Sequence, residues 1–194
     1  KDLSELLLSW IGSEKPITIL DISDIPSDIM MSIAGTLLNI LYEALFWGQE
    51  IDVGGRKQPL LIVLEEAHNY LRSGENSISS RNVQRIAKEG RKYGVGLMLV
   101  TQRPSELDET VLSQCGTIIA LRMNNSKDRG YVSAAIQDEL RSIVDLLPSL
   151  RTGEAIISGE GVSIPSRIQF NKLANAPKSA DPMVSKQWNA PRSR

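Results

Sequence analysis

A run of five aliphatic residues that ends in two adjacent carboxylates constrains this chain more than any other stretch. Leu60 to Leu64 are all aliphatic, Pro59 precedes them, and Glu65 and Glu66 follow directly. A continuous apolar run of this length is typical of a strand that is buried on both faces, as in a parallel sheet. Ligands of open α/β sheets bind beyond the carboxyl ends of such strands. The two acids are therefore predicted to lie at a ligand-binding edge.

Two carboxylates at such an edge need a cation or a hydrogen-bond donor, because burying a bare charge is unfavourable. One interpretation is a Walker B strand. In that interpretation one acid holds Mg²⁺, directly or through water, and the other orients or deprotonates the water that attacks a γ-phosphate. The alternative is a solvated strand end, or the first turn of a helix, without chemistry. The motifs that follow in the chain favour the first interpretation.

Length and composition indicate one ordinary globular domain. The chain has 194 residues, 41% of them hydrophobic and 23% charged, and a net charge of −1. No overall positive field is available for nucleic acid, so any such contact must be local. The single cysteine, Cys115, cannot form a disulfide within the chain and is predicted to be a buried structural thiol. Low cysteine use and the absence of a signal-peptide pattern lead us to expect a cytoplasmic protein.

Alternating patterns along the chain predict an α/β fold. Strands are predicted at 17–22, 60–64, 95–101, 117–122, 153–159 and 166–170, and helices at 2–11, 27–48, 79–93, 105–114 and 126–147, the last with a break near Gln137. This order gives a mainly parallel sheet flanked by helices, with late strands that can pair antiparallel. Residues 29–47 are expected to form a buried helix capped by Ser27 or Asp28, not a membrane span. Residues 1–170 are assigned to the core and 171–194 to a tail.

A polar residue ends the strand that follows the acidic strand. Gln102 comes directly after the apolar run 95–101. Its amide is suited to sensing a γ-phosphate or positioning water. Gln102 alone would more simply cap the next helix, but together with Glu65 and Glu66 it favours the sensor interpretation.

Basic residues mark the helix between these two strands. Arg91 stands at the end of that helix, where it can reach across a subunit interface as an arginine finger, or complement the helix C-terminus together with Lys92. Arg81, Arg85, Lys88 and Lys92 share one helical face and form a candidate DNA-backbone contact. A solvated charged face is the commoner explanation of such a stripe.

The only histidine of the chain, His68, follows the acidic pair. A zinc site is not expected there, because no cluster of cysteine, histidine and acidic residues surrounds it in the sequence. We expect His68 instead to form hydrogen bonds near the acids or to shape their position.

The combined motifs resemble the HerA branch of the HerA/FtsK ATPases. The motifs are LIVLEEAHN from Leu60, EGRKYGVG from Glu89, VTQRP from Val100 and LPSLRTGEA from Leu147, and the likeness covers about residues 17–170. The resemblance implies a RecA-like P-loop NTPase fold, a homo-hexameric ring, and ATP-driven translocation along double-stranded DNA. It also implies a nuclease or a sirtuin-like or other effector protein as partner, and no membrane.

Matching positions carry roles over from that family. Glu66 matches the catalytic glutamate, Gln102 the sensor and Arg91 the interface arginine. Glu65 stands where the family more often has the aspartate linked to Mg²⁺, so the metal geometry there is less defined.

One expected motif is absent from the sequence. No G-x-x-x-x-G-K-[ST] phosphate-binding loop occurs in the 194 residues. We expect this loop to lie upstream of Lys1, so that the chain is the C-terminal part of the core and binds ATP weakly or not at all by itself. The alternatives are a RecA-like assembly module without enzymatic activity that scaffolds an effector complex, and a motor that acts on protein.

Overall fold

The strands of the computed structural model form two sheets. The structure describes residues 3–11, 15–50, 57–74, 77–136 and 138–174. Strands β1 (Leu60–Leu64) and β2 (Val95–Leu99) pair in parallel, and strands β3 (Thr117–Leu121), β4 (Glu154–Gly159) and β5 (Ser166–Gln169) pair antiparallel in that order. Leu64 lies opposite Leu99, so β1 and β2 end at the same edge. The predicted α/β class, including antiparallel late strands, is confirmed.

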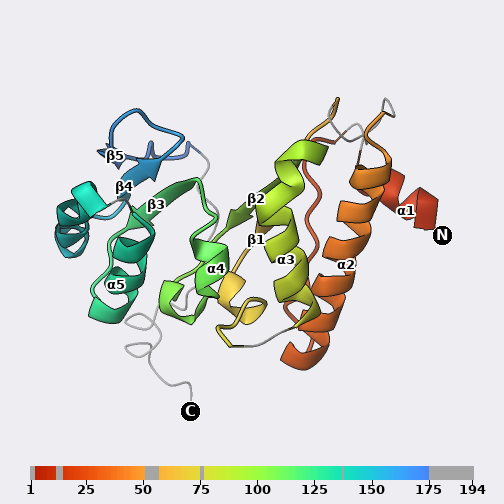
Figure 1. Cartoon of the computed structure of the whole chain (residues 1–194), viewed down its shortest axis with the longest axis horizontal. Coiled ribbons are helices and arrows are strands. Elements are labelled where there is room, and N and C mark those ends of the chain that lie inside the picture. Colours follow the sequence, from red (N-terminus) through yellow and green to blue (C-terminus); the bar gives the residue numbers. More distant parts are fainter. Residues whose placement is uncertain (1–2, 12–14, 51–56, 75–76, 137, 175–194) are drawn as a thin grey trace, which may run out of the picture.

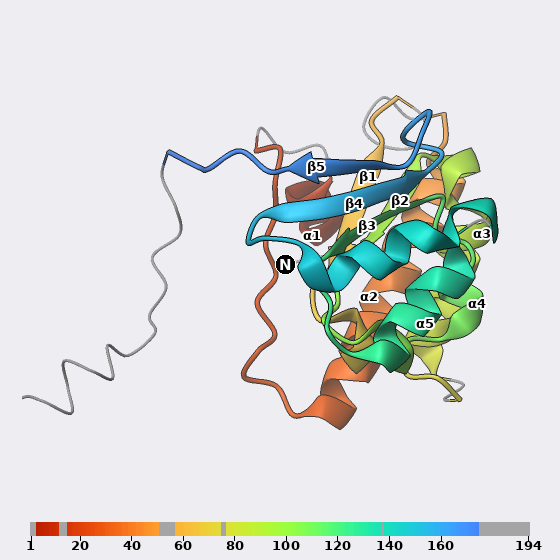
Figure 2. The same ribbon diagram turned by 90° about the vertical axis from the view of Figure 1, so that its left-hand side faces the viewer.

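Helices α2 to α5 gather on one side of the strands (Figures 1 and 2). The α-helices are α1 (Leu3–Trp10), α2 (Ser27–Trp47), α3 (Ile78–Glu89), α4 (Glu109–Leu112) and α5 (Ser126–Ala135), and the 3-10 segments are η1 (Ala67–Asn69), η2 (Gly90–Tyr93), η3 (Pro104–Glu106) and η4 (Asp138–Ser149). Ile136 is extended after α5, which confirms the predicted break, although Gln137 itself lies outside the described residues. Helices α2 to α5 lie on the same side, and two clusters of buried side chains form the core there and around β4.

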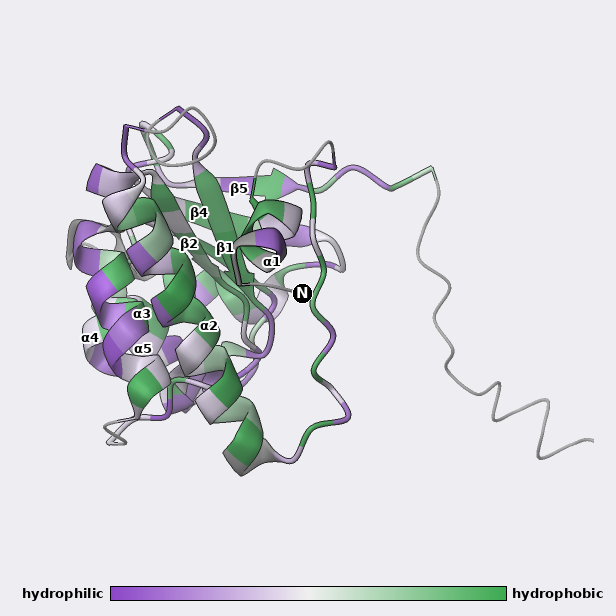
Figure 3. Cartoon of the chain, turned by 90° about the vertical axis from the view of Figure 1, so that its right-hand side faces the viewer, coloured by the Kyte–Doolittle hydropathy of each residue, from purple (hydrophilic) through white to green (hydrophobic). Residues whose placement is uncertain are grey.

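The prediction that the acidic strand is buried on both faces is wrong for the described chain. Side chains along β1 alternate, and Leu61 and Val63 are 59% and 47% exposed. Met98 on β2 is exposed beside them. Helices α2 to α5 cover one face of this apolar sheet, and no described element buries these three side chains on the other face; Figure 3 shows β1 as hydrophobic along its length.

The predicted strand at residues 17–22 is also wrong. These residues form no strand, and Ile17 and Ile19 are 74% and 87% exposed. A strand needs a neighbour for its backbone hydrogen bonds, but this segment runs as an unpaired thread away from the helices (Figures 2 and 3). Asp21 instead caps a turn, where its Oδ1 accepts from the backbone N–H and the hydroxyl of Ser23 at 3.0 and 2.7 Å.

Helix α2 packs one face into the core, but only 28% of the stretch Ile29–Trp47, which is long and apolar enough to cross a membrane by composition, is buried. The predicted buried helix is therefore only partly confirmed. Leu38, Tyr42 and Leu45 are buried in the core cluster. The helix begins at Ser27 and its cap position is Pro26, not Ser27 or Asp28 as expected; the side chains of these two residues lie outside the described part of the chain. The predicted helix at 105–114 is split into η3 and α4.

Candidate functional site

The two acids lie where the backbone pairing of β1 and β2 becomes irregular. The N–H of Val100 donates to the carbonyl of Leu64, and the carbonyl of Val100 accepts from Ala67, both at 2.9 Å. A regular parallel ladder would place Glu66 in the position of Ala67, so one extra residue is inserted as in a β-bulge. The insertion is accommodated at Glu66, which has φ 49° and ψ 48°. It is the only residue other than glycine with a positive φ among those described.

This left-handed turn aims the Glu66 side chain at the next strand. The amide Nε2 of Gln102 donates to Oε1 of Glu66 at 2.9 Å. Oε2 of Glu66 is buried and has no hydrogen-bond partner, although the Glu66 side chain as a whole is 44% exposed. A non-glycine residue in this conformation is disfavoured by roughly 1 kcal/mol or more, and such strain gathers at functional sites. The structure thus brings together Glu66 and Gln102, two residues singled out in the sequence.

A second set of contacts joins the loop that follows β1 to the loop that follows β2. Nδ1 of His68 lies 3.1 Å from Oγ1 of Thr101 and 3.4 Å from Oε2 of Glu66. Oγ1 of Thr101 also accepts from the backbone N–H of Arg103 at 3.0 Å, which closes the turn that carries Gln102. His68 therefore lies beside Glu66, one of the two acids, as the sequence predicted. Sequence reasoning missed Thr101, whose only signal was a hydroxyl at the end of an apolar strand.

A buried carboxylate anchors the far end of the Gln102 loop. Asp128, in the first turn of α5, is 6% exposed, and its Oδ1 accepts from the backbone N–H of Ser105 at 3.1 Å. A polar pocket of about 390 Å³ opens next to it, lined by Gln102, Arg103, Ser105, Glu106, Asn125 and Asp128. No sequence pattern marked Asp128, because its role depends on where α5 packs.

The donor set fits Mg²⁺ held together with phosphates. Glu65 is exposed at the edge, and Oε2 of Glu66 is an acceptor without a partner. No group of three or more histidine, cysteine or acidic residues in the described part of the chain is arranged to hold a metal by itself. Mg²⁺ commonly uses one or two carboxylates together with waters and substrate phosphates, and this edge offers the carboxylates of such a set.

Arg91 lies at the opposite edge of the parallel pair. It is exposed in η2, and the N–H of Leu60 at the start of β1 donates to the carbonyl of Gly94 at 2.8 Å. Five residues of strand span about 17 Å, which separates Arg91 from Glu66 and Gln102. Arg91 therefore does not reach the acids of its own chain.

The basic stripe on α3 is only partly available to a ligand. Arg85 forms ion pairs with Glu43 and Glu89 at 2.7 and 3.1 Å, and its guanidinium lies 4.4 Å from the ring centre of Tyr42. Arg81 and Lys88 are exposed. Arg85 thus holds α2 against α3, and the candidate DNA contact is reduced mainly to Arg81 and Lys88.

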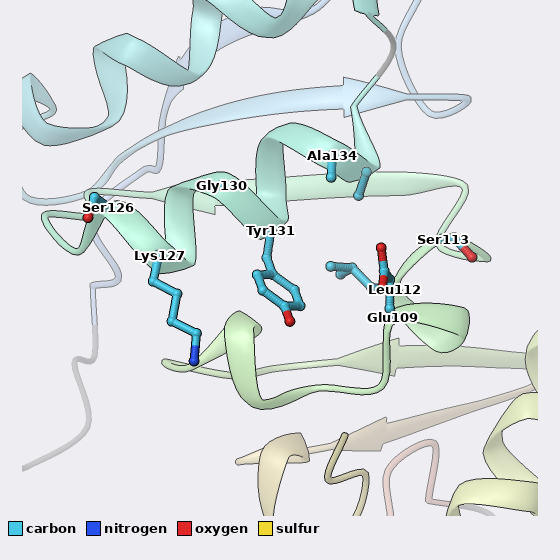
Figure 4. Close-up of a pocket in the computed structure, with 9 residues that line it drawn as sticks. Glu109, Leu112, Ser113, Ser126, Lys127, Gly130, Tyr131 and Ala134 are labelled. Atoms are coloured by element: carbon cyan, nitrogen blue, oxygen red, sulfur yellow. The ribbon is translucent and has the colours of Figure 1, made fainter. Parts of the chain in front are cut away.

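Two further features lie apart from the acids. A pocket of about 420 Å³ separates α4 from α5, and Figure 4 shows Leu112 and Tyr131 pointing toward each other across it. The half-buried thiol of Cys115 donates to the carbonyl of Val111 at 3.6 Å, and burial raises its pKa. A raised pKa makes the thiolate scarce, which agrees with the predicted structural role.

Comparisons with known proteins agree with the resemblance. A family model described as "Helicase HerA-like C-terminal" matches residues 16–190. The chain is 41% identical over 134 residues to the DNA double-strand break repair helicase HerA of Sulfolobus acidocaldarius, covering 69% of the chain and 27% of that relative. It is 42% identical over 112 residues to the helicase of the same name from Pyrococcus furiosus, covering 58% and 20%. The chain thus spans about a quarter of the length of such relatives.

Solved structures support the fold. The genome packaging NTPase B204 from Sulfolobus turreted icosahedral virus 2, in complex with ATP-gammaS, matches with a TM-score of 0.58 and 17% identity, over 86% of this chain and 72% of that one. VirB4 of Thermoanaerobacter pseudethanolicus also matches with a TM-score of 0.58, at 13% identity, over 79% and 40%. These likenesses indicate a RecA-like fold of the P-loop NTPase kind. The family match over residues 16–190 shows that the chain belongs to the family of HerA-like helicase C-terminal domains.

Proposed function

We propose that this chain, within a longer protein, is the C-terminal part of an ATPase core. The core hydrolyses ATP to move double-stranded DNA. The observation that carries the proposal is the hydrogen bond from Gln102 to Glu66 at the carboxyl ends of two parallel strands. The helicase names of its relatives and the nucleotide analogue bound to a structural neighbour support the same reading.

The residues at this edge take complementary roles. Glu66 acts as the general base that orients and deprotonates the attacking water, and Gln102 donates its amide to the γ-phosphate or to that water. Glu65 holds Mg²⁺ directly or through water. The metal, when bound, neutralises charge on the ATP phosphates.

Arg91 acts in a neighbouring subunit. Because it lies at the opposite edge from Glu66 in its own chain, a phosphate contact by Arg91 requires a second copy. A homo-hexameric ring supplies that geometry, with Arg81 and Lys88 as candidate contacts to the DNA backbone. A nuclease, or a sirtuin-like or other effector protein, is the proposed partner, and the cytoplasm the proposed location.

The test is the Glu66→Gln variant of the full-length protein that contains this chain. Removing a general base lowers turnover by roughly a hundred- to ten-thousand-fold. We expect DNA-stimulated ATP hydrolysis to fall by that factor while the oligomer, measured by light scattering, stays intact. The exposed Glu160→Gln variant is the matched control and should hydrolyse ATP normally. Unchanged hydrolysis in the Glu66→Gln variant would refute the catalytic assignment.

The second candidate is an assembly module without enzymatic activity. Such a module would have kept the fold and lost nucleotide binding. ATP binding by the full-length protein distinguishes the two candidates, because only the ATPase requires it. Adding duplex DNA during hydrolysis further separates a DNA motor, which is stimulated, from a motor that acts on protein.

A further inference from the structure

His68 occupies a central place between the two loops of the site. Its side chain is 14% exposed, and its Nδ1 faces both Oγ1 of Thr101 and Oε2 of Glu66. Only the contact with Thr101 meets hydrogen-bond geometry, while the 3.4 Å approach to Oε2 is an electrostatic one. The state of Nδ1 therefore decides whether His68 attracts or repels the carboxylate.

The neighbours of Nδ1 favour one tautomer. Oγ1 of Thr101 already accepts one bond, from the N–H of Arg103, and has a second lone pair for another donor. A bare nitrogen lone pair at Nδ1 would face the carboxylate oxygen of Glu66, which is repulsive. A proton on Nδ1 instead donates to Thr101 and places the partial positive charge of the N–H next to Oε2, an atom that is buried without a hydrogen-bond partner.

We propose that His68, with its proton on Nδ1, is the positioning residue that fixes Glu66 for hydrolysis. It pairs with Thr101, and through that hydroxyl with the Gln102 turn, so that base and sensor are held as one unit. Glu66 needs this support because its backbone is left-handed and one of its oxygens has no donor. The proposal rests on the proposed function of Glu66.

A positioning role predicts a particular kinetic pattern. His68 has no described contact with the region where nucleotide would be held other than through Glu66, so nucleotide affinity should not depend on it. Misplacing a catalytic group by about 1 Å can lower turnover by roughly a hundredfold. Loss of the Nδ1 donor should therefore reduce kcat and leave the KM for ATP unchanged.

The experiment compares three substitutions of His68 in the full-length protein. An asparagine amide nitrogen overlies the Nδ1 position, a glutamine amide reaches toward Nε2, and leucine has no donor. We expect the His68→Leu and His68→Gln variants to lose roughly 10- to 100-fold in kcat, with ATP affinity and oligomeric state preserved. The His68→Asn variant should keep most of the turnover.

Substitutions of Thr101 test the same hydrogen bond from its other partner. They keep the proposal testable if the His68→Leu variant does not fold. Thr101→Ser keeps the hydroxyl, and Thr101→Val keeps the shape without it. We expect the serine variant to be active and the valine variant to lose kcat at unchanged KM. In the Thr101→Val background, the advantage of His68→Asn over His68→Leu should become smaller, because the hydroxyl partner of the amide is gone while Oε2 of Glu66 remains.

Three results would overturn the proposal. They are normal kcat in the His68→Leu variant, equal loss in the His68→Asn and His68→Leu variants when both are folded, and equal activity of the serine and valine variants at Thr101. Failure of the proposed function is distinguishable, since it appears as normal hydrolysis in the Glu66→Gln variant, whatever happens at His68.

Discussion

The side-chain amide of Gln102 donates to Oε1 of Glu66 across the ends of two parallel strands, over 2.9 Å and 36 residues of sequence. Parallel pairing of β1 with β2 aligns the two strand ends, and the left-handed turn at Glu66 rotates its carboxylate toward the neighbouring strand. Neither feature alone would make this contact. The pair links the proposed base of the reaction to the proposed sensor of the phosphate.

The link predicts that Gln102 and Glu66 act as one unit in hydrolysis. Removing a single donor at a developing charge lowers kcat by roughly a hundred- to a thousandfold, which we expect for Gln102→Ala. The Gln102→Ala/Glu66→Gln double variant should be no slower than Glu66→Gln alone, because residues that act together are not additive. Steady-state ATP hydrolysis by the full-length protein measures this, with the exposed Gln114→Ala as control. Losses that multiply would show that the two residues act independently.

The position of Arg91 predicts complementation between subunits. Arg91→Ala and Glu66→Gln variants should each lose DNA-stimulated hydrolysis, by roughly a thousandfold or more for the arginine. A mixed oligomer contains interfaces in which the intact Glu66 of one subunit meets the intact Arg91 of another. Mixing the two variants before assembly should therefore restore part of the activity. A mixture no faster than its components would mean that Arg91 does not act across the interface.

Close packing at Gly35 in α2 and open space at Gly130 in α5 predict opposite effects of alanine at these two glycines. A Cβ at Gly35 would lie 2.8 Å from the backbone nitrogen of Ser79 and 3.0 Å from Cγ2 of Ile78. We expect Gly35→Ala to lower the free energy of unfolding by about 1–3 kcal/mol. A Cβ at Gly130 in α5 meets nothing within 4 Å, so Gly130→Ala should raise it by about 0.5–1 kcal/mol. Denaturant unfolding measures both, and a stabilising Gly35→Ala would contradict this packing.

The buried hydroxyl of Tyr42 predicts loss of stability at alkaline pH. Burial, together with the hydrogen bond that Tyr42 donates to Glu89, raises its pKa from 10.0 to about 12. A raised folded pKa gives a contribution that is complete below the unfolded pKa of 10.0 and is lost as pH rises toward about 12. The free energy of unfolding should therefore fall across that window.

Tyr42→Phe is the variant that checks this assignment. Since phenylalanine does not titrate, the alkaline fall should become smaller than in the parent protein. A remainder is expected, because burial also raises the pKa of Tyr70. An equally steep fall in the Tyr42→Phe variant would assign the effect to other groups. Urea unfolding at a series of pH values between about 9 and 12 provides the comparison.

Local patterns were sufficient for most of the elements. The apolar run before Glu65 and the amphipathic helix around Arg85 are features of short segments, and the structure has a strand and a helix at these places. Residues 17–20, which are extended but unpaired, show the limit of such patterns. These residues favour a strand, but β structure forms only where a neighbouring strand supplies the hydrogen bonds.

The sequence by itself determined which residues end the strands, and so which polar groups share an edge. Apolar runs become strands, and the first polar residues after parallel runs meet at the same side of the sheet. Only the tertiary structure decided how those groups meet. It inserted one residue at Glu66, turned its carboxylate to Gln102, placed His68 against Thr101 and engaged Arg85 with Glu43. These contacts join residues 33 to 42 positions apart, and side-chain direction over such separations is set by strand register and helix packing, which no local pattern encodes.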